Sequence, residues 1–148
     1  MRTNDISPAA SASAGTSTNQ PPSLQVENIE RGIGSATATF NAGPEHLNIK
    51  GMLHGGIIAG LMDVIMAIGA GSHPDPAKRR FSITLSLSMN FIGSAGQGPL
   101  ALRAETVGGG KRTCFCESRI EDAVGNLIAT AQGAFKLMDA GSERAANS

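Results

Sequence analysis

The sequence predicts an α+β fold in which one antiparallel sheet of five to six strands curls around a single long, apolar helix. Three observations lead to this prediction. Residues 57–70 are apolar or small apart from one aspartate, residues 81–91 alternate between apolar and small polar side chains, and short turns rich in Gly separate the segments that follow. A long apolar segment predicts a buried helix, whereas alternation with period two predicts a strand.

The helix is expected over about residues 54–70, most of which read IIAGLMDVIMAIGA. Gly71, Pro74 and Pro76 follow it, and these residue types commonly end helices. Because the segment is apolar on nearly every side, we expect protein to surround the helix.

Strands are expected before and after the helix. Residues 81–91 should place their apolar side chains on one buried face and their polar side chains on the other. Hairpin-length connections predict that the last four strands form an antiparallel meander. Small residues along one face of the last strand would let a helix approach closely. The expected strand segments are 24–41 (two strands with a turn at Arg31-Gly32), 81–91, 99–107, 113–121 and 127–138.

One folded domain is expected at residues 23–138, because a chain of 148 residues suffices for a single core. Residues 1–22 are rich in Ser, Ala, Thr and Pro, and we expect a disordered leader there. Residues 139–148 are expected to form a similar disordered tail. The leader lacks the apolar stretch of a secretory signal, so a cytoplasmic location is expected.

The composition excludes several function classes. Twelve basic residues balance twelve acidic ones, so the positive field of a nucleic-acid-binding protein is absent. No apolar run reaches the ~18 residues that suggest a membrane span. Cys114 and Cys116 lie about 7 Å apart on one face of a strand, where a disulfide is strained, and no His cluster completes a zinc site. We expect no metal and no cofactor.

Asp63 is the only ionisable residue in the apolar segment 57–70. A buried, unpaired carboxylate is costly, so such a residue is usually paired, protonated or functional. His54, Gly55 and Gly56 open the helix, and a helix N-terminus offers unpaired N–H groups and a partial positive charge. Glycines expose that backbone, which suits an oxyanion hole, and a poorly solvated carboxylate can activate water or attack directly.

Each of these residues also has a purely structural interpretation. Asp63 could pair with a buried donor, and Gly55 and Gly56 could serve close packing. His54 is more often a cap or packing residue than a catalyst. Asn48, in the turn-rich loop before the helix, could equally be a turn former or a ligand.

The region from about residue 45 to residue 138 resembles the hotdog-fold acyl-CoA thioesterases, most closely the phenylacetic-acid-degradation type. The stretches LSMNFIGSA and GNLIATAQGAF are part of the likeness. The resemblance implies a hotdog fold and hydrolysis of an acyl-CoA thioester as the substrate. The residues that carry it are Asn48, Gly51, His54, Gly55, Gly56, Leu61 and Asp63.

The resemblance also implies roles for particular residues. Asp63 corresponds to the carboxylate that acts as nucleophile or as general base on water, and Gly55 to the N–H that polarises the thioester carbonyl. Asn48 matches a position that helps to hold substrate or water, and Thr84 falls where relatives carry a hydroxyl that orients the water. Met62 stands where several relatives have Ala.

Further residues are candidates for binding the substrate. His54 and Gly56 lie at the predicted helix start, beside the expected oxyanion hole. Basic side chains could meet CoA phosphates or simply form solvated turns. They are Lys111 and Arg112, and also Lys78, Arg79 and Arg80.

Two other functions compete with hydrolysis. One is a non-catalytic hotdog module that binds acyl-CoA. The other is a hotdog hydratase, although the Asp-x-x-x-x-x-His pattern of that group is absent from the loop and the helix.

Helix geometry predicts a homodimer. Gly55 and Asp63 are eight residues apart, which is about 12 Å along one helix. A thioester must lie within about 3–3.5 Å of both the N–H donor and the attacking atom. Two antiparallel helices related by a two-fold axis could satisfy both, with Asn48 and Gly55 from one chain and Asp63 and Thr84 from the other. The resemblance also implies a dimer, often paired again into a tetramer.

Overall fold

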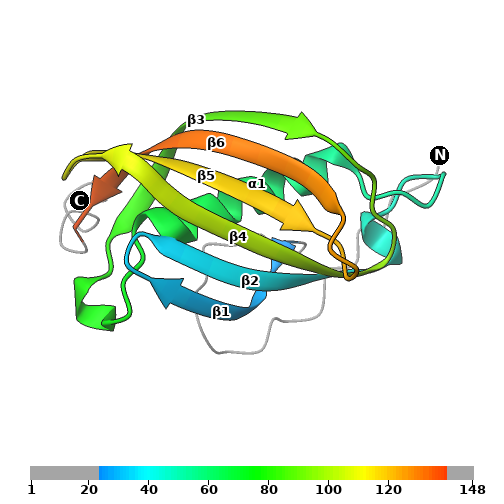
Figure 1. The fold of residues 1–148 in the computed structure, drawn as a ribbon, viewed down its shortest axis with the longest axis horizontal. Helices are drawn as coiled ribbons and strands as arrows, with labels where there is room; N and C mark the ends of the chain where they lie inside the picture. Colours follow the sequence, from blue (N-terminus) through cyan, green and yellow to red (C-terminus); the bar gives the residue numbers. More distant parts are fainter. Residues whose placement is uncertain (1–23, 140–148) are drawn as a thin grey trace, which may run out of the picture.

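The computed structural model describes residues 24–139, and Figure 1 shows their fold. The predicted leader at 1–22 and nearly all of the predicted tail at 139–148 lie outside these residues. Two short 3-10 helices, Pro44–His46 and Pro76–Lys78, flank the long helix. The main elements are β1 (Glu27–Gly32), β2 (Ser35–Ala42), α1 (Gly55–Ala70), β3 (Phe81–Phe91), β4 (Gly98–Gly109), β5 (Thr113–Glu121) and β6 (Leu127–Met138).

A single six-stranded sheet curves around α1, in the strand order β1-β2-β4-β5-β6-β3 (Figure 1). Every neighbouring pair of strands is antiparallel. The predicted α+β fold, with one sheet around one long helix, is therefore confirmed. Within residues 24–139, no helix is both long and apolar enough to span a membrane.

The prediction that the last four strands form one meander is wrong. β4, β5 and β6 do form a meander, but β3 pairs with β6 at the edge of the sheet and not with β4. Residues 92–97 carry the chain past the end of the sheet, and the N–H groups of Ile92 and Gly93 both donate to the carbonyl of Ile128 at 2.9 Å. Six extended residues reach about 20 Å, whereas three strand spacings need only about 14 Å. A hairpin-length link therefore does not require a hairpin.

The predicted division of β3 into a buried apolar face and a polar face is also wrong. The hydroxyl of Ser82 donates to the carbonyl of Ala67 in α1 at 2.8 Å, so a polar side chain near the start of β3 faces the helix. A bulge between Thr84 and Ser86 then shifts the register. Beyond it, Leu87 lies opposite the buried Gly133, so the apolar side chains turn to the helix side.

The core lies between α1 and the inner face of the sheet. The prediction that small residues on β6 line the helix-facing side is confirmed, because Ala129, Ala131 and Gly133 are all buried. α1 also approaches β4 closely, since a Cβ added to Gly69 would lie 3.3 Å from the Cβ of Ala104. The largest fully buried side chains are Phe135, Leu61, Met62, Ile65, Met66, Leu100, Leu102, Ile120, Ile128 and Cys116.

Candidate active site

The start of α1 is held in place by the loop before it. His46 is buried; its Nδ1 accepts the N–H of Gly43 at 2.9 Å, and its carbonyl accepts the N–H of His54 at 3.0 Å. His54 is the N-cap residue of α1, but its side chain makes no capping hydrogen bond. Within residues 24–139, no group accepts the N–H of Gly55 or Gly56, and both glycines are exposed. The helix therefore presents free donors to solvent.

Only the side-chain oxygen of Asn48 forms hydrogen bonds within the loop. Its Oδ1 accepts the backbone N–H of Lys50 at 2.9 Å and of Met52 at 3.1 Å, and Gly51 closes the turn with a φ of 74°. These two donors fix which end of the amide is oxygen. No partner of the Asn48 Nδ2 group lies within residues 24–139. Asn48 is thus a turn former through its oxygen, while its nitrogen is left as a free donor.

Asp63 and Thr84 are brought together between α1 and β3. Thr84 Oγ1 donates to Asp63 Oδ1 at 2.6 Å. Asp63 is only half-buried in the single chain, because the adjacent β3 is an edge strand. The expectation that protein surrounds the helix on all sides is therefore wrong for this side of one chain. The carboxylate is neither unpaired nor fully buried.

The donors and the carboxylate are too far apart to act together within one chain. Gly55 and Asp63 both lie on α1, and eight residues of helix span about 12 Å. The candidate site residues therefore fall into two separate groups. We call Asn48 and Gly55 the donor half and Asp63 and Thr84 the acid half.

Phe91 is a site neighbour that the sequence reasoning missed. A Cβ added to Gly55 would lie 3.4 Å from the Phe91 ring, and Phe91 itself is 55% exposed. The ring lies at the end of β3, beside the donor half. Its place at the end of the alternating segment was visible in the sequence, but its contact with the helix start depends on the β3 bulge.

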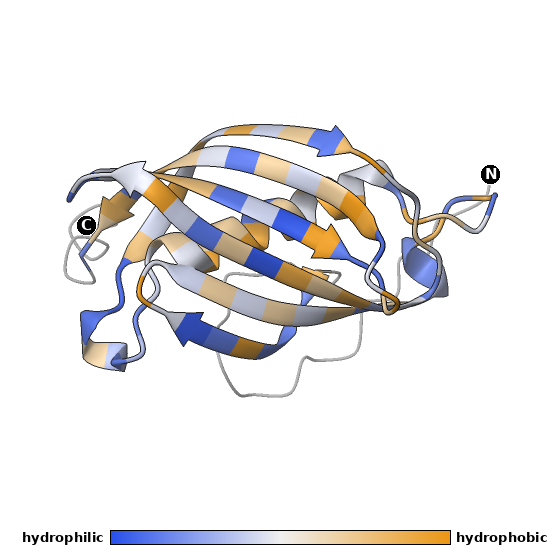
Figure 2. Cartoon of the chain, in the orientation of Figure 1, coloured by the Kyte–Doolittle hydropathy of each residue, from blue (hydrophilic) through white to orange (hydrophobic). Residues whose placement is uncertain are grey.

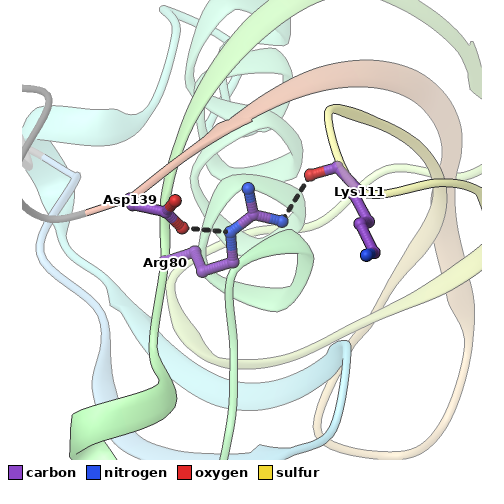
Figure 3. A network of polar contacts seen from close by, with 3 residues as sticks. All are labelled: Arg80, Lys111 and Asp139. Carbon is purple, nitrogen blue, oxygen red and sulfur yellow. Dashed lines mark hydrogen bonds and ion pairs between the residues drawn. The ribbon is translucent and has the colours of Figure 1, made fainter.

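The predicted phosphate-binding residues lie at the other end of the helix. Lys111 and Arg112 occupy the turn between β4 and β5. Arg80 donates to the carbonyl of Lys111 and, at 3.1 Å, to Asp139 Oδ1, while the Lys111 side chain points away from Arg80 (Figure 3). The Arg80 N–H also donates to the carbonyl of Gly71 at 2.9 Å, just after α1 ends. Since α1 has 16 residues, this end is about 24 Å from the donor half of the same chain.

Positive charges are crowded at this end of the molecule. Burial, and then the nearby Arg79 cation, lower the pKa of Arg31. No carboxylate within residues 24–139 forms an ion pair with Arg31, Lys78, Arg79, Lys111 or Arg112. Arg80 differs from them, because its guanidinium contacts Asp139 and the carbonyl of Lys111 (Figure 3).

Comparison with known proteins agrees with this architecture. The chain is 28% identical over 111 residues to a "Putative esterase" of Archaeoglobus fulgidus, an alignment that covers 74% of this chain and 69% of the relative. A conserved protein of Pseudomonas aeruginosa has a similar structure, with a TM-score of 0.69, 26% identity, and coverage of 78% of this chain and 90% of that one.

A "Hypothetical Thioesterase Protein with Coenzyme A" from Streptococcus pneumoniae shares the fold. Its TM-score is 0.65 at 23% identity, and the match covers 78% of this chain and 85% of that one. The profile of the thioesterase superfamily matches residues 50–129, which is more than half of the 148-residue chain. This hotdog-fold chain therefore belongs to the thioesterase superfamily, a family of hydrolases.

Proposed function

We propose that the protein hydrolyses an acyl-CoA or aryl-acyl-CoA thioester to the free acid and CoA. The observation that carries the proposal is the pair of half-sites: free N–H donors at the start of α1, and a carboxylate held by a hydroxyl halfway along the same helix. The streptococcal relative named with coenzyme A supports the choice of a CoA ester.

The donor half would stabilise negative charge on the thioester oxygen. The Gly55 N–H lies at the positive end of the helix dipole, and the Asn48 Nδ2 group is a second free donor. Preorganised donors of this kind are worth roughly 3–4 kcal/mol each in the transition state. The exposed Gly56 N–H and the neighbouring His54 would border the bound acyl group.

In the acid half, Asp63 would activate a water molecule or attack the thioester carbonyl itself. Thr84 donates to one carboxylate oxygen of Asp63, which orients the group, and the other oxygen has no hydrogen-bond partner within residues 24–139. In the general-base route, Asp63 takes a proton from water, a new C–O bond forms and the C–S bond breaks. The thiolate then leaves and takes up that proton. In the nucleophilic route, the free oxygen of Asp63 forms a C–O bond to the carbonyl carbon, the C–S bond breaks and the CoA thiolate leaves. Water then hydrolyses the mixed anhydride, which releases the acid and restores the Asp63 carboxylate, and the thiolate takes up the proton that water gives up.

The complete site would be composite, formed by two chains in a homodimer. The exposed edge of β3 supports this assembly, because Ile83, Leu85 and Phe91 are 42%, 56% and 55% exposed. A long apolar edge strand is unusual in a monomer. With two antiparallel copies of α1 side by side, the donor half of one chain would face the acid half of the other.

The same arrangement would bring positive charge to the CoA phosphates. If Gly55 of one chain faces Asp63 of the second copy, that copy's helix continues seven residues, about 10 Å, beyond Gly55. Its basic end, with Lys111 and Arg112, would then lie beyond the donor half, where the phosphates of a bound CoA would extend. Neither cation forms an ion pair with another residue of the described range 24–139, which supports the proposal.

The test is a thiol-release assay over a panel of acyl-CoA and aryl-acyl-CoA esters. Turnover should require the Nδ2 group of Asn48 as a hydrogen-bond donor. In Asn48→Asp the side-chain oxygen still accepts from Lys50 and Met52, but the Nδ2 donor is lost, so kcat should fall on the order of 10²-fold or more with the fold intact. Tight CoA-ester binding without thiol release would support the non-catalytic module instead.

Subunit mixing tests the composite site. Asn48→Asp and Asp63→Ala are combined under conditions that exchange subunits. Each mixed dimer would have one site with both lesions and one with neither, so activity should recover toward a quarter of wild type. No recovery despite proven exchange would mean that each site lies within one chain.

A further inference from the structure

His46 is buried although the turn that contains it is hydrophilic. Figure 2 shows the 3-10 helix Pro44–His46 as a hydrophilic segment after β2, yet His46 is only 6% exposed, whereas His54 is exposed. The His46 ring meets Phe40 of β2 edge-on, with the ring centroids 4.9 Å apart. A buried polar side chain needs hydrogen-bond partners, so the contacts of His46 indicate its role.

Two hydrogen bonds join His46 to Gly43. The N–H of Gly43 donates to Nδ1 of the ring at 2.9 Å, and the N–H of His46 donates to the carbonyl of Gly43 at 3.1 Å. Because a backbone N–H can only donate, Nδ1 must carry no hydrogen, so the ring is neutral and has its proton on Nε2. The observed turn therefore requires an uncharged imidazole.

His46 also fixes the loop that carries the donor half. Residues 46–54 form a short hairpin, closed by an antiparallel bridge and by the bond from the His54 N–H to the His46 carbonyl at 3.0 Å. Asn48 lies two residues beyond His46 in this hairpin, and Gly55 directly follows its last residue. A shift of the His46 backbone would therefore move both donors of the donor half.

Protonation would give the His46 ring a different partner. Imidazole is the side chain that most readily changes charge between about pH 5 and 8. With a hydrogen on Nδ1, the ring and the Gly43 N–H would be two donors facing each other. The carboxylate of Glu45 could accept from Nδ1 instead, because its Oε1 lies 3.5 Å away.

Glu45 is the charged group that faces the ring in this exchange. β2 contributes Phe40, which is uncharged, and the start of α1 contributes the backbone N–H of His54, whose own side chain is exposed. The two charge states of His46 therefore favour two arrangements of residues 43–46, with the ring bonded to Gly43 when neutral and to Glu45 when protonated.

We propose that His46 is a positioning residue, which holds Asn48 and Gly55 in their places for the reaction only while its ring is neutral. The inference rests on the proposed function, in which those two residues bind the thioester oxygen. His46 itself does not touch the substrate. As the pH falls, the ring exchanges Gly43 for Glu45, the base of the hairpin moves, and turnover falls although every catalytic group is present.

His46→Asn tests the proposal, because the Oδ1 of Asn occupies the position of Nδ1 and accepts from Gly43 but does not titrate. Wild-type kcat should fall roughly tenfold between about pH 7.5 and about pH 5.5, whereas that of His46→Asn should change less than about twofold. His46→Leu has no acceptor and should be slow at every pH. If ionisation of Asp63 alone sets the acid limb, wild type and His46→Asn will have the same pH profile, which would overturn the proposal.

His73→Asn is the matched control. The Nδ1 of His73 accepts the N–H of Asp75 at 2.9 Å, which is the same kind of bond, but it lies in the turn after the other end of α1. This variant should keep the wild-type pH profile. If His46→Asn does not fold, Glu45→Gln removes the charged partner of the protonated ring and should move the acid limb to lower pH.

NMR separates the failure of this inference from the failure of the proposed function, because it needs no substrate. In the isotope-labelled wild-type protein, the amide signals of Gly43 and Gly55 should shift together with the titration of the His46 ring, and they should not shift in His46→Asn. Amides that move without any thiol release would support the role of His46 and reject hydrolysis. Amides of the wild type that stay unchanged between about pH 7.5 and about pH 5.5 would overturn the proposal.

Discussion

The two edges of the sheet differ sharply. β1 has six residues, a bulge, and a positive φ of 52° at Asn28, and its exposed side chains include Glu30. β3 has 11 residues and exposes Leu85 and Phe91 together with the unpaired side of its backbone. Short, bulged and charged edges discourage pairing with another chain, whereas long apolar edges allow it.

The edge that is open to a partner is also the edge beside the candidate site residues. Thr84 lies on β3 and holds Asp63, and Phe91 at the end of the same strand lies against Gly55. No candidate site residue lies on β1. The open edge and the candidate site residues therefore occupy the same side of the molecule, which is the arrangement that the proposed composite active site requires.

The largest effect is expected at the β3 side from Asp63→Asn. The amide keeps the shape and can still accept from Thr84, but it is neither a base nor a nucleophile. Turnover should fall on the order of 10²–10⁴-fold, measured by thiol release on the best substrate. Glu30→Gln, the matched change at the β1 edge, should have no effect. Nearly full activity in Asp63→Asn would contradict the mechanism, and an equal loss in His54→Ala would make His54 a catalyst.

The next largest effect is expected from Leu85→Lys. A lysine on this edge strand opposes pairing with a second chain, and it should separate the dimer that β3 is proposed to form. Activity per chain should then fall as the protein is diluted, approaching that of Asp63→Asn, and recover in part at high concentration. Ile33→Lys is the control, because Ile33 is 78% exposed in the turn between β1 and β2.

The molecular mass of the assembly in solution and the activity per chain must fall together in this experiment. A Leu85→Lys protein that loses mass but keeps full activity at every dilution would show that one chain holds a complete site. Loss of mass in Ile33→Lys would show that the two edges do not differ as proposed.

A smaller effect is expected from Thr84→Val, which keeps the shape of the side chain but removes the 2.6 Å hydrogen bond to Asp63. A hydrogen bond to a charged group contributes about 1.5–3 kcal/mol, so kcat should fall roughly 10-fold or more. Thr84→Ser keeps the hydroxyl and should retain most of the activity. If Thr84→Ser loses as much as Thr84→Val, packing rather than the hydroxyl is responsible.

Local patterns predicted the elements of this fold, and long-range pairing decided the rest. α1 was expected at 54–70 and occupies Gly55–Ala70, because its apolar content and the Gly and Pro after it are local signals. The place of β3 beside β6 was not predicted, because a short link is compatible with both a hairpin and a crossing. No local pattern signals that choice.

The candidate site shows the same division. The spacing of Gly55 and Asp63 on one helix could be read from the sequence, and it led to the proposal that two helices form each site. The resemblance alone set Thr84 in the same site as Asp63. The alternation of residues 81–91 did not predict their contact, because a bulge turns the start of β3 so that polar side chains face α1. The free Nδ2 of Asn48 was equally hidden, since it depends on which backbone groups its oxygen accepts.

The smallest effect is expected for the buried cysteines. Separating the proposed dimer at β3 should not change their reactivity. Cys114 and Cys116 are free and buried on the inner face of β5, which is a central strand. Burial raises the pKa of the Cys116 thiol to about 11, so little of the reactive thiolate exists near pH 8. An aromatic disulfide reagent at that pH should leave both thiols unreacted in wild type and in Leu85→Lys, and it should titrate two thiols after denaturation. Rapid reaction in Leu85→Lys alone would mean that the substitution unfolds the sheet, so its lost activity would no longer report on the edge.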